Sequence, residues 1–112
     1  MTQNNDDAVM LITGGSRGIG AATARLAARG GWRVMFSYRD DRHAADQVVQ
    51  SILDAGGRAS AVRADVAREE DVLALFGALD AQGGRLGALV NNAGIVAPAA
   101  RVDEFDLARL DR

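Results

Sequence analysis

The chain has 112 residues, 48% of them hydrophobic and 25% charged, with a formal net charge of −2 at neutral pH. This size suits one small domain with a single core, so we expect residues 1–112 to form one domain. The chain has no basic stripe with interleaved aromatic residues, so we expect no nucleic-acid partner, and it has no apolar run long enough to span a bilayer.

The start of the chain does not predict secretion, and its cysteine and histidine content does not predict a metal site. Residues 1–7 are polar and end in Asp6 and Asp7, which is the wrong charge for a secretory signal, so we expect a cytoplasmic protein. The chain has no cysteine, in keeping with the lack of a disulfide framework. His43 is the only histidine and has no second ligand near it in sequence, so we expect a surface residue and no metal.

The first part of the chain alternates apolar and amphipathic segments. Residues 8–12 are a short apolar run before a glycine-rich segment, which predicts a strand buried on both faces. The alanine-rich residues 19–29, followed by two glycines, predict a helix with a glycine stop. Residues 32–37, which begin with a tryptophan that we expect to pack, predict a second strand, and residues 38–42 a polar loop.

The alternation continues to the end of the chain. Helices are predicted at residues 44–55 and 69–79, and strands at 59–64 and 86–90. A loop and the start of a further helix are predicted within residues 95–112. The expected apolar face of the helix at 44–55 is Ala45, Val48, Val49, Ile52 and Leu53. That of the helix at 69–79 is Val72, Leu73, Leu75, Phe76 and Leu79. In the last segment Asp106 is the expected N-cap, with Phe105 and Leu110 as a hydrophobic staple.

The order β-α-β-α-β-α-β predicts an α/β fold, a Rossmann-like doubly wound parallel sheet with helices on both faces. Ligands bind to such sheets at the carboxyl ends of the strands. The unusual residues of this chain fall at those ends, in residues 13–20, 37–39, 65–66 and 91–94. We therefore expect the functional site there.

The glycine-rich segment has the spacing G-x-x-x-G-x-G, with glycine at positions 14, 18 and 20. A phosphate group needs backbone N–H donors at close range and the positive end of a helix, and glycine removes side chains that would block its approach. The segment therefore predicts a phosphate-binding turn. The alternative is a tight strand-to-helix turn without a ligand.

Three motifs resemble those of the short-chain dehydrogenase/reductase family. Residues 13–20 match its T-G-x-x-x-G-[IL]-G motif, residues 91–94 match N-N-A-G, and Asp65-Val66 match its aspartate-hydrophobic pair. The resemblance covers essentially the whole chain and is to the N-terminal, cofactor-binding half, so it implies a sheet truncated after the fourth strand. Among the branches, the chain looks most like the 3-oxoacyl-carrier-protein-reductase-like and sugar-dehydrogenase-like members.

The resemblance implies a set of cofactor-binding residues. The glycines and Ile19 would surround the pyrophosphate, and Asp65 would accept a hydrogen bond from the adenine amino group. Asp65 could instead be a turn residue, and the two asparagines could bond the backbone in a turn. The full expected set is Gly14, Ser16, Arg17, Gly18, Ile19, Gly20, Tyr38, Arg39, Asp65, Val66, Asn91, Ala93 and Gly94.

The charges near the second strand favour NADP(H) over NAD(H). An NAD site places an acidic side chain against the ribose hydroxyls, but Ser37 and Tyr38 stand there, followed by Arg39. With Arg17 in the glycine loop, two guanidinium groups and a hydroxyl suit a 2′-phosphate. The two aspartates at positions 40 and 41 are the counter-argument.

The catalytic residues that the resemblance implies are a serine, and a tyrosine and lysine in the arrangement Y-x-x-x-K. All 13 basic residues of this chain are arginine, and its only tyrosine is Tyr38, on the adenosine side. We therefore expect no catalytic residues and no hydride transfer by these 112 residues alone. Three hypotheses stay open. In the first, these residues are part of a longer NADP-dependent oxidoreductase, and that parent protein acts on a small carbonyl or alcohol substrate and forms homo-oligomers. The other two are a non-catalytic dinucleotide-binding module and an interaction protein.

Overall fold

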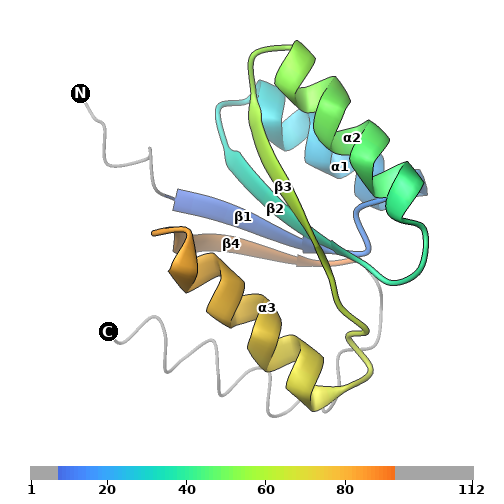
Figure 1. Ribbon diagram of the computed structural model, residues 1–112. Helices are drawn as coiled ribbons and strands as arrows, with labels where there is room; N and C mark the ends of the chain where they lie inside the picture. The colour runs from blue at the N-terminus through green and yellow to red at the C-terminus, as the bar shows by residue number, and fades with distance from the viewer. Residues whose placement is uncertain (1–7, 93–112) are drawn as a thin grey trace.

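The computed structural model describes residues 8–92. The polar start of the chain, the expected helix within residues 95–112, and the expected site residues Ala93 and Gly94 lie outside the described residues. The elements follow the predicted order, with ends within about two residues of those expected. They are β1 (Ala8–Thr13), α1 (Gly18–Arg29), β2 (Arg33–Tyr38), α2 (Arg42–Asp54), β3 (Arg58–Arg63), α3 (Glu69–Ala81) and β4 (Arg85–Asn91) (Figure 1).

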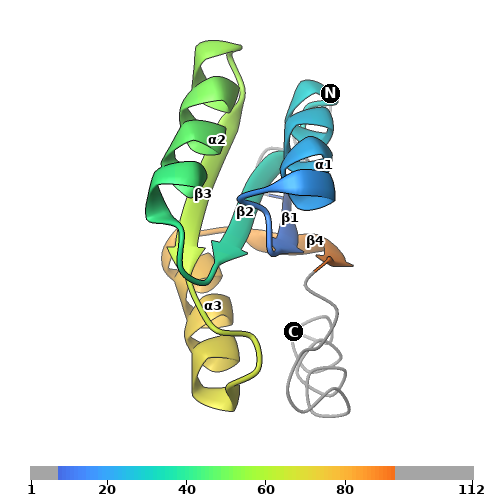
Figure 2. The ribbon, with the colours of Figure 1, turned by 90° about the vertical axis from the view of Figure 1, so that its right-hand side faces the viewer.

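The strands form one parallel sheet in the order β3-β2-β1-β4. Helices α1 and α2 cover one face and α3 covers the other, which confirms the predicted doubly wound fold (Figure 2). The chain runs outward from β1 to β3 and then returns to place β4 on the other side of β1. This reversal puts a topological switch point at the carboxyl ends of β1 and β4.

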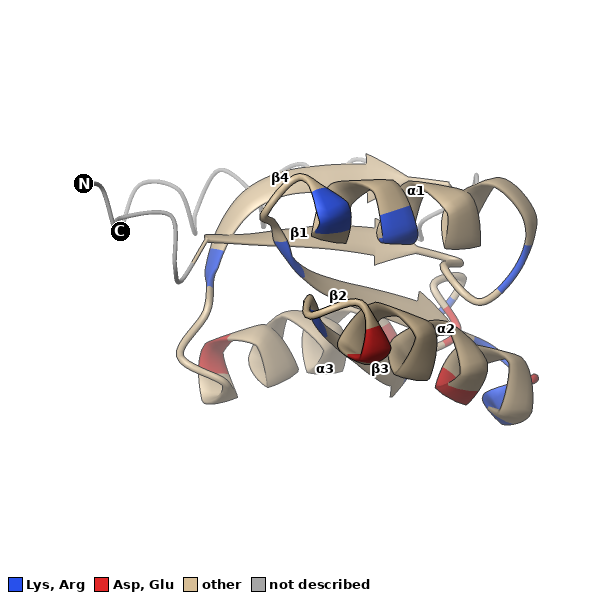
Figure 3. Cartoon of the chain, turned by 90° about the horizontal axis from the view of Figure 1, so that it is seen from above, with Lys and Arg blue, Asp and Glu red and all other residues tan. Residues whose placement is uncertain are grey.

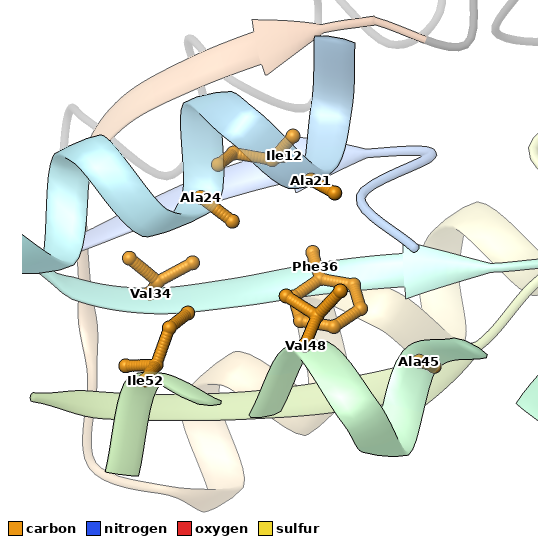
Figure 4. Close-up of a cluster of buried hydrophobic side chains, with 8 residues drawn as sticks. All are labelled: Ile12, Ala21, Ala24, Val34, Phe36, Ala45, Val48 and Ile52. Atoms are coloured by element: carbon orange, nitrogen blue, oxygen red, sulfur yellow. The ribbon is translucent and has the colours of Figure 1, made fainter. Parts of the chain in front are cut away.

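Each face of the sheet has its own core. On the α1–α2 face, small alanines on the helices let them approach the sheet, and the side chains of Val34 and Phe36 fill the space beneath (Figure 4). On the α3 face, Leu75, Phe76 and Leu79 of α3 pack against Val9, Leu11 and Met35. Because β1 contributes to both cores, it is buried on both faces as its continuous apolar run predicts.

Two leucines were wrongly expected in the apolar faces of their helices. Leu53 of α2 is 47% exposed and Leu73 of α3 is 48% exposed. Each follows directly after a buried residue, Ile52 and Val72, and one residue turns a helix by about 100°. This rotation by one residue turns both leucine side chains away from the sheet.

Tyr38 also differs from the sequence prediction, because it is the last residue of β2 and not part of a loop. Its carbonyl accepts a hydrogen bond of 2.9 Å from the N–H of Ala64, so the β2–β3 pairing extends beyond the end of β3. Trp32, expected to pack, is half-buried at the other end of β2 and reaches β4. A Cβ at Gly87 would lie 2.8 Å from its ring, so a larger residue at this strand position would displace the Trp32 side chain.

Candidate functional site

The turn between β1 and α1 is a close-packed backbone loop. Gly14 and Gly18 have positive φ angles of 72° and 58°, a conformation that glycine adopts without strain. Gly20 brings the first turn of α1 against the Gly14 carbonyl, because a Cβ at Gly20 would lie 2.9 Å from the Gly14 carbonyl carbon. A Cβ at Gly18, in contrast, would meet nothing within 4 Å. Gly20 therefore lets the turn pack closely against α1, and open space remains beside Gly18.

The start of α1 has no negative charge to offset its helix dipole. Its N-cap is Arg17, which makes no side-chain capping bond, and its first turn has no acidic residue. In α2 the Asp41 carboxylate caps the N–H of Ala44 at 2.9 Å, and α3 has three acidic residues in its first turn. Among the three described helices, α1 is thus the one whose N–H groups and positive end stay open to an anion.

The asparagines at the end of β4, Asn91 in the strand and Asn92 after it, tie this turn to the sheet. The Thr13 hydroxyl donates to Asn91 Oδ1 at 3.0 Å, and Asn92 Nδ2 donates to the Gly14 carbonyl at 3.0 Å. The expected alternative, asparagine side chains that bond the backbone, therefore describes what Asn92 does. The turn and the end of β4 form one unit at the switch point.

The end of β2 presents an exposed arginine. Arg39 is 70% exposed in its side chain and lies 3.6 Å from the Asp40 carboxylate, while Tyr38 is half-buried against the core of the α1–α2 face. Asp41, one of the two acids that could have reached a ribose, is held as the cap of α2. Arg17 lies in the neighbouring turn and is also exposed. The basic character of the turn between β1 and α1 is seen as a blue segment in Figure 3.

One of the two hydroxyl groups at the end of β2, that of Ser37, is turned into the fold. Ser37 is only 2% exposed, and its Oγ accepts a hydrogen bond from the Gly14 N–H at 3.1 Å. The Ser37 hydroxyl is therefore engaged with the glycine-rich turn.

Asp65 lies two residues after the end of β3, and one of its carboxylate oxygens accepts a hydrogen bond within a turn. Its Oδ1 accepts from the Ala67 N–H at 3.0 Å, and its own N–H donates to Asp71 Oδ2 at 2.8 Å. Its role as a turn residue is thus real, and Oδ2 is left for another donor. Asp71, which accepts this hydrogen bond, was not predicted from the sequence as a contributor to the site. The available signal was its place three residues after the N-cap Arg68, where acidic side chains reach back to the backbone. Val66, next along the chain, is half-buried against the core of the α3 face.

The charged residues around this edge are solvated. A hydrogen bond from the Arg68 guanidinium, reinforced by its charge, holds the pKa of Glu70 below its ordinary value. Both side chains are more than half exposed, so the pair contributes little stability. Within residues 8–92, no group of three or more His, Cys, Asp or Glu is placed to hold a metal ion, and no helix is long and apolar enough to cross a membrane.

Comparison with known proteins identifies the family. A family model described as short chain dehydrogenase matches residues 8–112. The chain belongs to the short-chain dehydrogenase family. This assignment agrees with the motifs at the ends of β1, β3 and β4, and members of the family are oxidoreductases that bind a nicotinamide dinucleotide.

Individual relatives extend well beyond this chain. It is 45% identical over 105 residues to the uncharacterized oxidoreductase YgfF of Escherichia coli (strain K12), covering 94% of this chain and 42% of that protein. It is 46% identical over 87 residues to a 3-oxoacyl-[acyl-carrier-protein] reductase of Synechocystis sp., covering 78% and 35%. A crystal structure of a metagenomic short-chain oxidoreductase in complex with NADP superposes with a TM-score of 0.68 and 36% identity, covering 75% and 38%. The chain therefore spans about two fifths of the length of these relatives.

Proposed function

We propose that the chain is the cofactor-binding part of an NADP(H)-dependent oxidoreductase that interconverts a carbonyl and an alcohol by hydride transfer. The observation that carries this is the start of α1, where a glycine-rich turn with open space beside it leads into a helix without a cap or an acidic residue. A dinucleotide pyrophosphate matches such a site in charge and in its need for backbone donors.

The residues around the turn fit the rest of a dinucleotide. Gly14, Ser16, Gly18, Ile19 and Gly20 would hold the pyrophosphate. The free oxygen of Asp65, with the Val66 backbone, would bind the adenine, and Asn91, Ala93 and Gly94 would line the ribose side. When bound, the nicotinamide supplies the hydride. The chain's own part, on this proposal, is to bind and orient the dinucleotide.

The choice of NADP(H) rests on charge at the end of β2. Arg39 is exposed there, Arg17 is exposed in the neighbouring turn between β1 and α1, and Asp41 is engaged as a helix cap. The Asp40 carboxylate lies beside Arg39 and would be repelled by a phosphate, so Arg39 would exchange this neighbour for the 2′-phosphate. The NADP complex of the metagenomic relative supports the same choice.

The test compares two double variants in the full polypeptide. Arg17→Ala with Arg39→Ala should weaken NADPH binding about tenfold or more, since a hydrogen bond to a charged group contributes about 1.5–3 kcal/mol, and should leave NADH nearly unchanged. Arg25→Ala with Arg29→Ala, also exposed but at the opposite end of α1, is the matched control and should change neither. Calorimetric titration with both cofactors is the measurement. Equal loss of NADPH and NADH, or no loss, would overturn the NADP assignment, and a folded parent chain that binds neither would overturn the proposed function.

A second candidate is a dinucleotide-binding module without turnover. These 112 residues contain no lysine, and Tyr38, the one tyrosine among them, packs at the end of β2, so on their own they would bind a dinucleotide without turnover. The intact mass of the natural polypeptide, followed by an assay for NADPH oxidation with carbonyl substrates, separates the two. Cofactor binding without oxidation of NADPH by the natural polypeptide would favour the module.

A further inference from the structure

Ser37 is a buried polar residue that none of the expected cofactor contacts uses. It is the penultimate residue of β2 and is 2% exposed. A buried hydroxyl needs hydrogen-bond partners, because an unpaired one carries the full cost of lost hydration. The partners that Ser37 has are informative, because both lie in the glycine-rich turn.

Ser37 holds two consecutive peptide groups of that turn. Its hydroxyl oxygen accepts a hydrogen bond from the Gly14 N–H at 3.1 Å, and its carbonyl accepts one from the Gly15 N–H at 3.0 Å. Gly15 is pressed so closely on β2 that a Cβ there would lie 2.5 Å from Phe36 Cβ. The first half of the turn is therefore fixed to β2 by one residue.

The same turn is held from the other side of β1 by Asn92, the residue that follows β4. Asn92 Nδ2 donates to the Gly14 carbonyl at 3.0 Å, so both polar groups of Gly14 are engaged, one toward β2 and the other toward β4. Without the Ser37 hydroxyl, the Gly14 N–H would have to find water or another acceptor. The peptide is free to rotate for that purpose, because glycine tolerates many conformations. Its rotation would move the residues that lead into α1.

We propose that Ser37 is a positioning residue for the dinucleotide pyrophosphate: its hydroxyl fixes the Gly14 peptide, and so sets the path of the turn into α1, without touching the cofactor. This rests on the proposed function for its ligand. It differs from a contact with the 2′-phosphate, because a residue that shapes the pyrophosphate turn affects NADPH and NADH alike.

The experiment measures the affinity of three ligands in the full polypeptide. Ser37→Ala should weaken NADPH and NADH by a common factor of about ten, the equivalent of one hydrogen bond, and leave adenosine 2′-monophosphate unchanged because this probe has no pyrophosphate. Ser37→Thr keeps the hydroxyl and should restore binding. Ser60→Ala removes a hydroxyl from the neighbouring strand β3, where it bonds only to the Gln82 side chain, and should change none of the three affinities.

A readout without cofactor separates this inference from the proposed function. Hydrogen exchange of the Gly14 amide should be about tenfold faster in Ser37→Ala than in the parent chain, and unaltered in Ser60→Ala. If the parent chain binds NADPH and Ser37→Ala has the same Gly14 exchange rate and the same ligand affinities as the parent, the positioning role is overturned. Loss confined to NADPH and adenosine 2′-monophosphate would overturn it in favour of a direct phosphate contact. If the parent binds no dinucleotide, the proposed function fails, and with it the role of Ser37 in binding.

The variant that removes the hydroxyl could also fail to fold. In that case Ser37→Cys, similar in shape but a weak acceptor, takes its place and should give the same pattern with a smaller factor. A folded Ser37→Cys protein with parental affinities and parental Gly14 exchange would contradict the proposal.

Discussion

The closest backbone approach in the candidate site, between Gly20 and Gly14, can be tested by adding a single methyl group. In Gly20→Ala the new Cβ would lie 2.9 Å from the Gly14 carbonyl carbon and 2.7 Å from Asn92 Nδ2, with the Gly14 oxygen nearer still. Carbon atoms in contact prefer about 3.5–4.0 Å, so the turn must move by roughly 1 Å. The obstructing group is backbone and cannot adopt another rotamer.

The expected cost follows from two effects. Overpacking of this kind costs about 1–3 kcal/mol, and loss of the Asn92–Gly14 hydrogen bond adds about 1 kcal/mol. We therefore expect Gly20→Ala to lower the free energy of unfolding by about 2–4 kcal/mol. In the fraction that stays folded, NADPH binding should weaken by at least about tenfold, because the displaced turn is the proposed pyrophosphate site.

Urea unfolding, followed by the fluorescence of the single tryptophan Trp32, measures the first quantity, and NADPH titration the second. The control is Gly30→Ala at the other end of α1, where φ is −80° and the atom nearest to the new Cβ would be the Ala27 carbonyl oxygen at 3.5 Å. Its effect should stay within about 0.5 kcal/mol. A Gly20→Ala protein as stable as this control, with undiminished NADPH affinity, would refute the close approach and the placement of the pyrophosphate.

Two further predictions concern α3. Gly77→Ala should stabilise the protein by about 0.5–1 kcal/mol, because Gly77 is exposed inside the helix and a Cβ there would meet nothing within 4 Å; destabilisation in urea unfolding would contradict this. The Glu70 carboxyl should titrate with a pKa below its ordinary value of 4.5, because the Arg68 guanidinium donates a hydrogen bond to it. Since this pKa is lowered in the folded state, the pair's small contribution to stability is present above pH 4.5 and is lost as the pH falls through the lowered value. Carbon-detected NMR titration should show the midpoint return toward 4.5 in Arg68→Ala, and an unchanged midpoint would show that the arginine is not the cause.

Local sequence patterns were enough to predict the fold. The apolar run of β1, the glycine stop after α1 and the glycine-rich turn each reflect interactions within a few residues, so composition and spacing predict them. The strand-helix alternation then leaves a parallel sheet with right-handed crossovers as the expected arrangement. Membership of the short-chain dehydrogenase family follows from motifs in the sequence itself.

Tertiary structure decided which polar groups meet. The bond from Ser37 to Gly14 joins residues 23 positions apart, and the bond from Asn92 to Gly14 joins residues 78 apart, so neither is visible as a local pattern. The exposure of Leu53 likewise depends on which part of α2 turns toward the sheet. Propensity and periodicity act over one or two turns of chain, whereas the partner of a side chain depends on where distant strands are placed side by side. The sequence therefore determined the elements and their order, and the packing of β2, β1 and β4 decided how the glycine-rich turn is held.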